Sequence, residues 1–144
     1  MTRVEVLTAA LAAFWLGLVV AISFIEAPLK FRAPGVTVQV GLAIGRLVFG
    51  ALNAVECVLA VSMMLLMSVG SPSAGEIAAG VAASAGLAIQ LLAVRPAMAR
   101  RTNAIRDGAE YAGRSRIHLV YVAVECVKAL ALIVVVWLVV SGSA

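Results

Sequence analysis

The sequence consists of long apolar runs separated by short polar stretches. Four such runs lie at residues 4–25, 46–68, 77–94 and 117–140. Each is close to the ~20 apolar residues that a helix needs to cross a bilayer. The runs are continuously apolar and lack the alternation of a barrel strand, so they predict helices. We therefore expect an all-α polytopic membrane protein, with four transmembrane helices in a single domain.

The composition agrees with a lipid environment. Hydrophobic residues make up 64% of the 144 residues and charged residues 12%, and the mean hydropathy is +1.12. Soluble domains are usually nearer to half apolar, so we expect no soluble domain within residues 1–144. No strongly basic segment precedes the first run, and this run is long enough to span. We therefore expect it to remain as a helix rather than to be cleaved as a signal peptide.

The positive charge of the chain is concentrated in two of the connections. The formal net charge is +4. Nearly all basic residues lie in or beside the first and third connections, at Lys30, Arg32, Arg46, Arg95, Arg100, Arg101, Arg106, Arg114 and Arg116. The positive-inside rule then places these connections in the cytoplasm and both termini outside, and we expect a bacterial inner membrane. The charge therefore indicates the topology of the chain in a lipid bilayer, and we expect no nucleic acid as a partner.

A short sequence repeat divides the chain into two similar halves. The letters AVECV occur at residues 54–58 and again at 123–127. Other matched positions keep nearly the same offset, which predicts two repeated helical hairpins at about 4–68 and 77–140. Two copies with the same orientation would be related by an axis along the membrane normal.

Two matched prolines accompany this repeat. Pro28 and Pro96 are each followed four residues later by an arginine. Because proline lacks the N–H that a continuing helix uses, we expect each proline to end its helix at the cytoplasmic face. The repeat also places Glu56 and Glu125 at one depth, about 14–15 Å into the bilayer.

Polar side chains form stripes on the predicted second and fourth helices. His118, Tyr121, Glu125 and Lys128 follow a 3-4-3 spacing, which puts them on one helix face. Asn53 precedes Glu56 by three residues on the second helix, and Gln90 on the third helix is roughly level with Tyr121. A charge facing hydrocarbon would cost at least ~2.5–3.5 kcal/mol, so we expect both stripes to face the interior of the bundle.

The two acids are expected to differ in protonation. Lys128 lies three residues after Glu125, so this pair can be ionised and neutralise itself. Glu56 has no such cation beside it on its own helix. Unless Lys128 reaches across the bundle, desolvation favours the protonated form of Glu56. A mid-membrane carboxyl group that gains and loses a proton suits proton coupling, whereas a buried charge pair can also serve assembly alone.

Enzyme and cofactor signatures do not occur. The sequence shows no nucleophile–base pair, phosphate loop or HExxH motif, so we expect no enzyme. Cys57 and Cys126 lack the spacing of a zinc site, and one histidine cannot supply bis-histidine haem ligation. We expect no metal and no cofactor. A single axial bond from His118 to a haem or chlorin is the least favoured interpretation.

Several short motifs along the chain belong to one pattern: Phe24, Phe31, Pro34, Gly35, the residues at 41–49, Arg95, Pro96 and His118. In these residues the chain resembles a four-helix membrane family of unknown function that includes a human transmembrane protein associated with drug resistance. The resemblance implies four helices and a role in export or tolerance.

Three functions follow in order of preference. The first is an ion- or proton-coupled carrier or exporter of a small solute, working as a homo-oligomer or with other membrane subunits. The second is a non-catalytic accessory subunit that stabilises a larger membrane complex. The third is a cofactor-dependent membrane enzyme. For the first, we expect the polar interior to be lined by Glu56, Glu125, Lys128, Asn53, His118, Tyr121 and Gln90.

Overall fold

The structure is a computed structural model, and it describes residues 1–110 and 116–142. Arg114, one of the basic residues noted above, lies outside this part of the chain. The described elements are α1 (Arg3–Val19), η1 (Val20–Glu26), α2 (Ala27–Leu29), η2 (Lys30–Arg32), α3 (Val38–Val69), α4 (Ala74–Ile89), η3 (Gln90–Val94), α5 (Arg95–Arg106) and α6 (Arg116–Ser141). All regular structure in these ranges is helical, which confirms the all-α prediction.

These elements join into four rods that are long and apolar enough to cross a membrane. The rods are Arg3–Arg32, Val38–Val69, Ala74–Arg106 and Arg116–Ser141, with 30, 32, 33 and 26 residues. At 1.5 Å per residue, even the shortest is about 39 Å long, which exceeds a hydrocarbon core of about 30 Å. The described chain is thus an integral membrane protein with four candidate spans.

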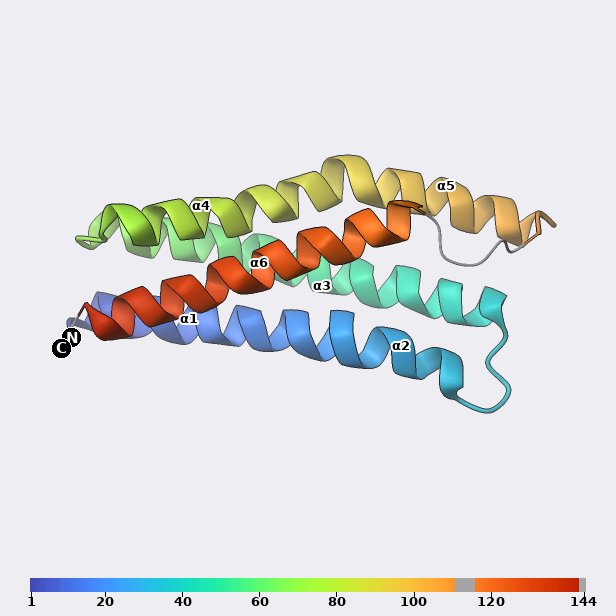
Figure 1. The fold of residues 1–144 in the computed structure, drawn as a ribbon, viewed down its shortest axis with the longest axis horizontal. Helices are drawn as coiled ribbons and strands as arrows, with labels where there is room; N and C mark the ends of the chain where they lie inside the picture. Colours follow the sequence, from blue (N-terminus) through green and yellow to red (C-terminus); the bar gives the residue numbers. More distant parts are fainter. Residues whose placement is uncertain (111–115, 143–144) are drawn as a thin grey trace.

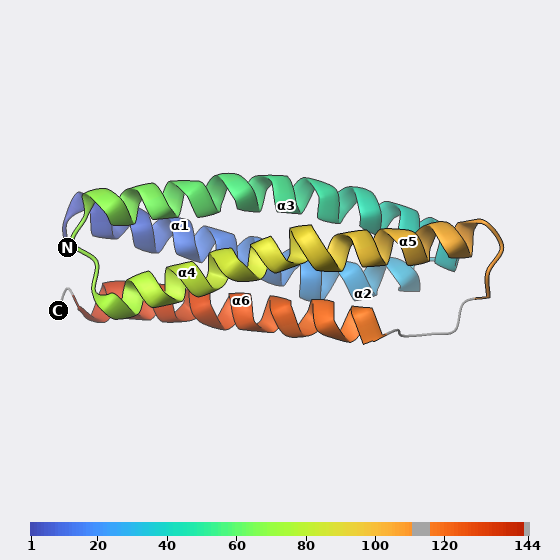
Figure 2. The same ribbon diagram turned by 90° about the horizontal axis from the view of Figure 1, so that it is seen from above.

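The rods pack side by side as an elongated four-helix bundle (Figure 1). The start of α1, the end of α6 and the turn between α3 and α4 lie at one end, here named the terminal end (Figures 1 and 2). The connection after η2 and the end of α5 lie at the opposite end, which carries most of the described arginines and is named the basic end. This separation of charge is the pattern that the sequence predicts.

Local sequence signals explain where three of the rods begin. Thr2 caps α1: its hydroxyl oxygen accepts from the Glu5 N–H at 3.2 Å, and the Glu5 carboxylate accepts from the Thr2 N–H at 2.8 Å. Thr37 and Ser73 cap α3 and α4 in the same way, through the N–H groups of Val40 and Glu76. Each cap satisfies donors that a helix start leaves unpaired.

The prediction that both prolines end their helices is wrong. The first rod continues to Arg32 and the third to Arg106, so helix persists beyond Pro28 and Pro96. Each proline is preceded by a π-helical segment, η1 or η3. The extra residue in the widened turn accommodates a ring that would otherwise clash with the preceding turn.

The two widened turns close with equivalent hydrogen bonds. The N–H of Ala27 donates to the carbonyl of Ile22, and the N–H of Arg95 donates to the carbonyl of Gln90. Each donor directly precedes a proline, and the two bonds are 68 residues apart in sequence. The same deviation from α-helical geometry therefore recurs at matched positions of the two predicted hairpins.

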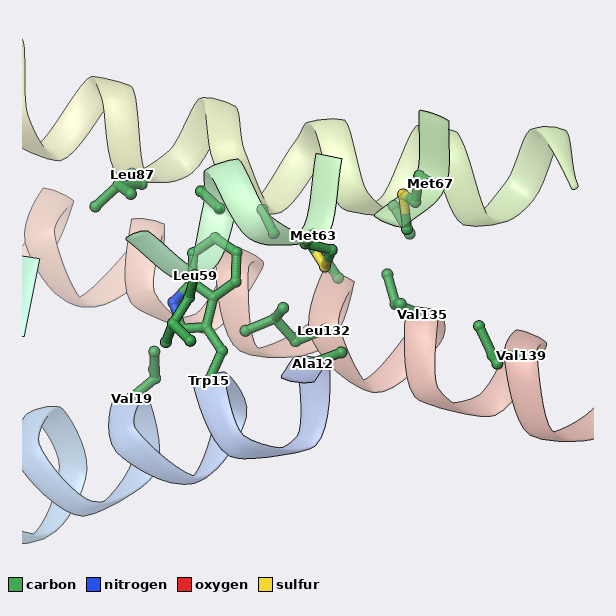
Figure 3. Packing of buried hydrophobic residues seen from close by; sticks show 14 residues of the cluster. Ala12, Trp15, Val19, Leu59, Met63, Met67, Leu87, Leu132, Val135 and Val139 are labelled. Carbon is green, nitrogen blue, oxygen red and sulfur yellow. The ribbon is translucent and has the colours of Figure 1, made fainter. Parts of the chain in front are cut away.

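The apolar core fills the bundle from its middle to the terminal end. Ala12, Trp15, Met63, Leu132 and Val135 are all fully buried there (Figure 3). Large apolar side chains also cover the outside of the bundle. Leu47, Val69, Leu92 and Trp137 are each at least 65% exposed, as expected for surfaces that contact lipid.

Candidate functional site

A cluster of ionisable side chains lies buried in the middle of the bundle. It contains Glu56 from α3 and Glu125 and Lys128 from α6, and each is 0% exposed. Gln90, the first residue of η3, is equally buried. Helix periodicity brings these groups together, because Glu125 and Lys128 are three residues apart on one face. The structure thus joins four of the side chains that the polar stripes singled out.

Lys128 is the centre of this cluster. Its Nζ lies 2.5 Å from Oε1 of Glu56 and 3.2 Å from Oε1 of Glu125. It also donates to Oε1 of Gln90 at 2.6 Å. Three donor directions of one ammonium group thus meet acceptors on three different helical rods. Lys128 thus reaches across the bundle to Glu56, so the condition under which the sequence predicts a protonated Glu56 is not met.

Two further donors hold the carboxylates. Trp15 of α1 donates its indole Nε1–H to Oε1 of Glu56 at 2.8 Å. Gln90 donates its Nε2–H to Oε1 of Glu125 in a short hydrogen bond. With Trp15 included, all four rods contribute to the cluster. From the sequence Trp15 is interpreted as a packing residue, although a tryptophan in the middle of a span, far from either interface, is a usable signal for a buried donor.

The cluster contains more negative than positive groups. Two carboxylates meet one ammonium in the described part of the chain, and the other members are neutral. Oε2 of Glu56, Oε2 of Glu125 and Oδ1 of Asn53 are buried without a hydrogen-bond partner among the described residues. An uncompensated charge in a low-dielectric interior is costly, and so is an unsatisfied polar atom. The arrangement can accept one additional positive charge.

Polar groups continue from the cluster toward the basic end. Tyr121 lies one turn before Glu125 on the same face of α6, and its hydroxyl group is 3.2 Å from Oγ of Ser23 in η1. The Tyr121 ring also packs edge-on against Phe49, with centroids 5.2 Å apart. One turn beyond Ser23, Glu26 pairs with Lys30 at 3.2 Å.

Apolar side chains, by contrast, separate the cluster from the terminal end. Fully buried Ala12, Met63, Leu132 and Val135 form successive layers on this side (Figure 3). A small pocket of about 240 Å³ opens at the terminal end and reaches Thr8, short of those layers. Polar groups therefore approach the cluster from one end of the bundle more closely than from the other.

Two further predicted site residues, Asn53 and His118, lie on the helices that carry the cluster. Asn53 is 2% exposed and lies one turn before Glu56 on the same face of α3. His118 is half-buried near the start of α6, about 10 Å along the helix from Glu125. Its predicted place in the polar interior stays a prediction.

Metal binding gains no support from the described residues. Nowhere in residues 1–110 and 116–142 do three His, Cys, Asp or Glu side chains gather as a metal site would require. Cys57 is half-buried and Cys126 exposed, and both are free thiols. The chemistry of the cluster is therefore that of carboxylates, an ammonium and hydrogen-bond donors.

The fold and the cluster can be set against known proteins. No family model, no curated protein and no solved structure matches this chain. No family match therefore supports the resemblance to the four-helix family. What the structure supports is the coarser statement of a membrane protein with four candidate spans.

Proposed function

We propose that this chain is a small proton-coupled membrane carrier for a small solute, and that Glu56 and Glu125 together hold the transported proton. One observation carries this proposal: two fully buried carboxylates share a single ammonium, and each keeps one oxygen without a donor. A bound proton would neutralise the excess charge and supply a missing donor at once. The proposed orientation places the basic end in the cytoplasm.

Glu56 is the better place for this proton. A proton on its Oε2 turns an unpartnered acceptor into a donor, and Oδ1 of Asn53 is an acceptor without a donor one turn earlier on the same helix face. Glu125 then remains ionised between Lys128 and Gln90, which both donate to it. Release of the proton recreates the uncompensated charge, so proton loss is coupled to rearrangement of Lys128 or to arrival of a cationic group of the solute.

A proton suits this site better than a metal cation does. The cluster members are packed to 0% exposure and already make short contacts with one another. A proton needs no cavity, whereas a cation such as Ca²⁺ needs a space surrounded by several oxygen ligands. No third acid comes close enough, among the described side chains, to complete such a shell.

The test is proton uptake by the purified protein. In liposomes with an internal pH-sensitive dye, an imposed pH gradient is expected to drive saturable proton uptake by the wild type. Glu56→Gln keeps the shape of the side chain but leaves Lys128 balanced by Glu125 alone, so uptake should be lost while the helix content stays unchanged. Uptake that persists at the wild-type level in Glu56→Gln would exclude the proposal.

Infrared spectroscopy provides a second test, which does not depend on proton movement across a membrane. A protonated carboxyl group has a C=O stretching band separate from the carboxylate bands. We expect this band in the wild type at neutral pH and its loss in Glu56→Gln. Glu76→Gln, in the first turn of α4 and outside the buried cluster, is the matched control and should leave the band in place.

The second candidate is an accessory subunit of a larger membrane complex. The observation that favours it is the closure of the cluster, in which Lys128 connects three rods and Trp15 the fourth. Such a cluster would fix helix register without any exchange of protons. Isolation from the native membrane in mild detergent separates the two functions, because stoichiometric partner chains support a subunit and a chain purified alone supports a carrier.

A further inference from the structure

A groove lies at the basic end, away from the buried cluster. It is formed by the first turns of α3 and the last turns of α5, and its volume is about 410 Å³. This volume falls within the range of small-molecule sites in proteins. The residues that line it include Val40, Ala43 and Leu47 on α3, and Ile105 on α5. Its floor is therefore apolar although it lies outside the main core.

Cationic and hydrogen-bonding side chains surround this apolar floor. Arg46 and Arg106 both line the groove, one from each helix, together with Asn103. The Arg46 guanidinium donates to Oδ1 of Asn103 at 2.8 Å, which ties α3 to α5. Asn103 is neutral, so this bond fixes the position of the Arg46 charge without compensating it.

The charge of Arg106 is only weakly compensated. Its Nε lies 3.5 Å from Oδ1 of Asp107, and these side chains are 70% and 69% exposed. An exposed pair of this length contributes little binding energy, and water and salt screen it. The groove therefore presents net positive charge above an apolar floor.

The length of the helices places the groove in the headgroup layer of the membrane. The stretch of α3 from Arg46 to Val69 is about 35 Å long, enough to cross the hydrocarbon core. Residues 38–45 then project past this core at the basic end. The third rod behaves likewise, since residues 77–94 span about 27 Å and α5 continues beyond them.

We infer that this groove binds one anionic phospholipid. The two arginines hold the phosphate group, and Val40, Leu47 and Ile105 contact the glycerol and the upper acyl chains. Charge complementarity and depth both argue for this occupant, because a soluble anion would gain nothing from the apolar floor and a zwitterionic lipid little from the net charge. Leu47, which is 76% exposed, faces outward where an acyl chain would lie.

The inference is tested by native mass spectrometry of the full-length protein in mild detergent with added lipid. Phosphatidylglycerol and phosphatidylcholine with the same acyl chains serve as the two probes. The wild type is expected to retain one phosphatidylglycerol in preference to phosphatidylcholine. Arg46→Gln and Arg106→Gln should each weaken this binding about fivefold, and together about 25-fold. Arg3→Gln, at the terminal end, is the matched control and should not change it.

A substitution that leaves all charges in place tests the apolar floor. Ala43→Trp fills the groove, so it should also reduce phosphatidylglycerol retention while Arg46 and Arg106 remain. An excess of inorganic phosphate should not displace the lipid; displacement would assign the site to a soluble anion instead. Equal retention of both lipids by the wild type, or unchanged retention in the double arginine variant, would overturn the inference.

Two measurements keep the lipid experiment independent of the carrier proposal. Circular dichroism and thermal unfolding show whether each variant is folded, and Gln substitutions on exposed helix surfaces should leave both nearly unchanged. Proton uptake by Arg46→Gln should stay at the wild-type extent, because the groove and the buried cluster share no residue. Loss of lipid binding and loss of proton uptake can therefore be told apart.

Discussion

The two hairpins of the bundle place an acid in the same cluster but surround it differently. In the second hairpin, Glu125 has Lys128 three residues later on its own helix. In the first, the position that corresponds to Lys128 at an offset of 69 residues is Leu59, which is buried and aliphatic. One ammonium therefore serves two carboxylates. A second lysine at position 59 would neutralise both acids, whereas no lysine at either position would leave two excess negative charges. The single excess negative charge therefore results from the difference between Leu59 and Lys128.

Two further pairs of positions at nearly the same offset also carry different residues in the two hairpins. Trp15 of the first hairpin corresponds at an offset of 68 to Ala83, and both are fully buried. Gln90 of the second corresponds to Ile22. The first hairpin thus supplies the large indole donor, and the second supplies the amide and the ammonium. The two halves of the chain therefore supply different hydrogen-bonding groups to one shared cluster.

Removal of the shared ammonium of Lys128 is expected to have the largest effect on stability. Lys128→Met leaves two carboxylates buried without a cation, and removal of one partner from a buried ion pair typically costs about 3–5 kcal/mol. We expect a loss of that size in the free energy of unfolding, measured by denaturant titration in detergent. Leu59→Met, the corresponding change in the first hairpin, should cost less than about 1.5 kcal/mol. Similar losses in both variants would contradict the central role of Lys128.

A smaller effect is expected at the indole donor. Trp15→Phe keeps an aromatic side chain but removes the Nε1–H that binds Glu56, and leaving a buried acceptor without its donor costs about 1–3 kcal/mol. Thermal unfolding should register this loss. Trp137→Phe is the control, since Trp137 is 65% exposed toward lipid, and its substitution should change stability little. If both variants unfold at the same temperature, the bond to Glu56 contributes nothing measurable to stability.

The smallest effect is expected on the polar side of the cluster. Tyr121→Phe removes the hydroxyl group that contacts Ser23, at a cost of about 0.5–1.5 kcal/mol in stability. The extent of proton uptake should stay the same, while its rate falls, because the hydroxyl group lies between the cluster and the basic end. Stopped-flow uptake measurements test this, and Ser23→Ala should reproduce the slower rate. A wild-type rate in both variants would show that protons reach the cluster by another route.

Much of this architecture follows from sequence alone. The four spans follow from run length, and the joint burial of Glu56, Glu125 and Lys128 follows from the cost of charge in hydrocarbon. The 3-4-3 spacing predicts that Tyr121, Glu125 and Lys128 share one inward face of α6, and all three are buried. The bond from Lys128 to Glu56 could not be derived, because it depends on which rods are neighbours and how far a flexible side chain extends.

Two features were missed for identifiable physical reasons. Trp15 reads as packing in a sequence, since an indole is large and apolar and its donor matters only when an acceptor faces it. Pro28 and Pro96 read as helix ends because proline removes a donor and clashes with the preceding turn. A single extra residue in that turn relieves the clash, and nothing in the local composition distinguishes this outcome from termination.

The widened turn at η3 has a consequence for the direction in which the basic end faces. Each residue advances a regular α-helix by about 100°, so one inserted residue changes the azimuth of everything downstream by that angle. α4 packs chiefly on α6, whereas α5, beyond η3, packs on the start of α3. The bulge therefore rotates the rest of the rod about its own axis. One side of the rod faces α6 within the bilayer, and a different side faces α3 at the membrane surface.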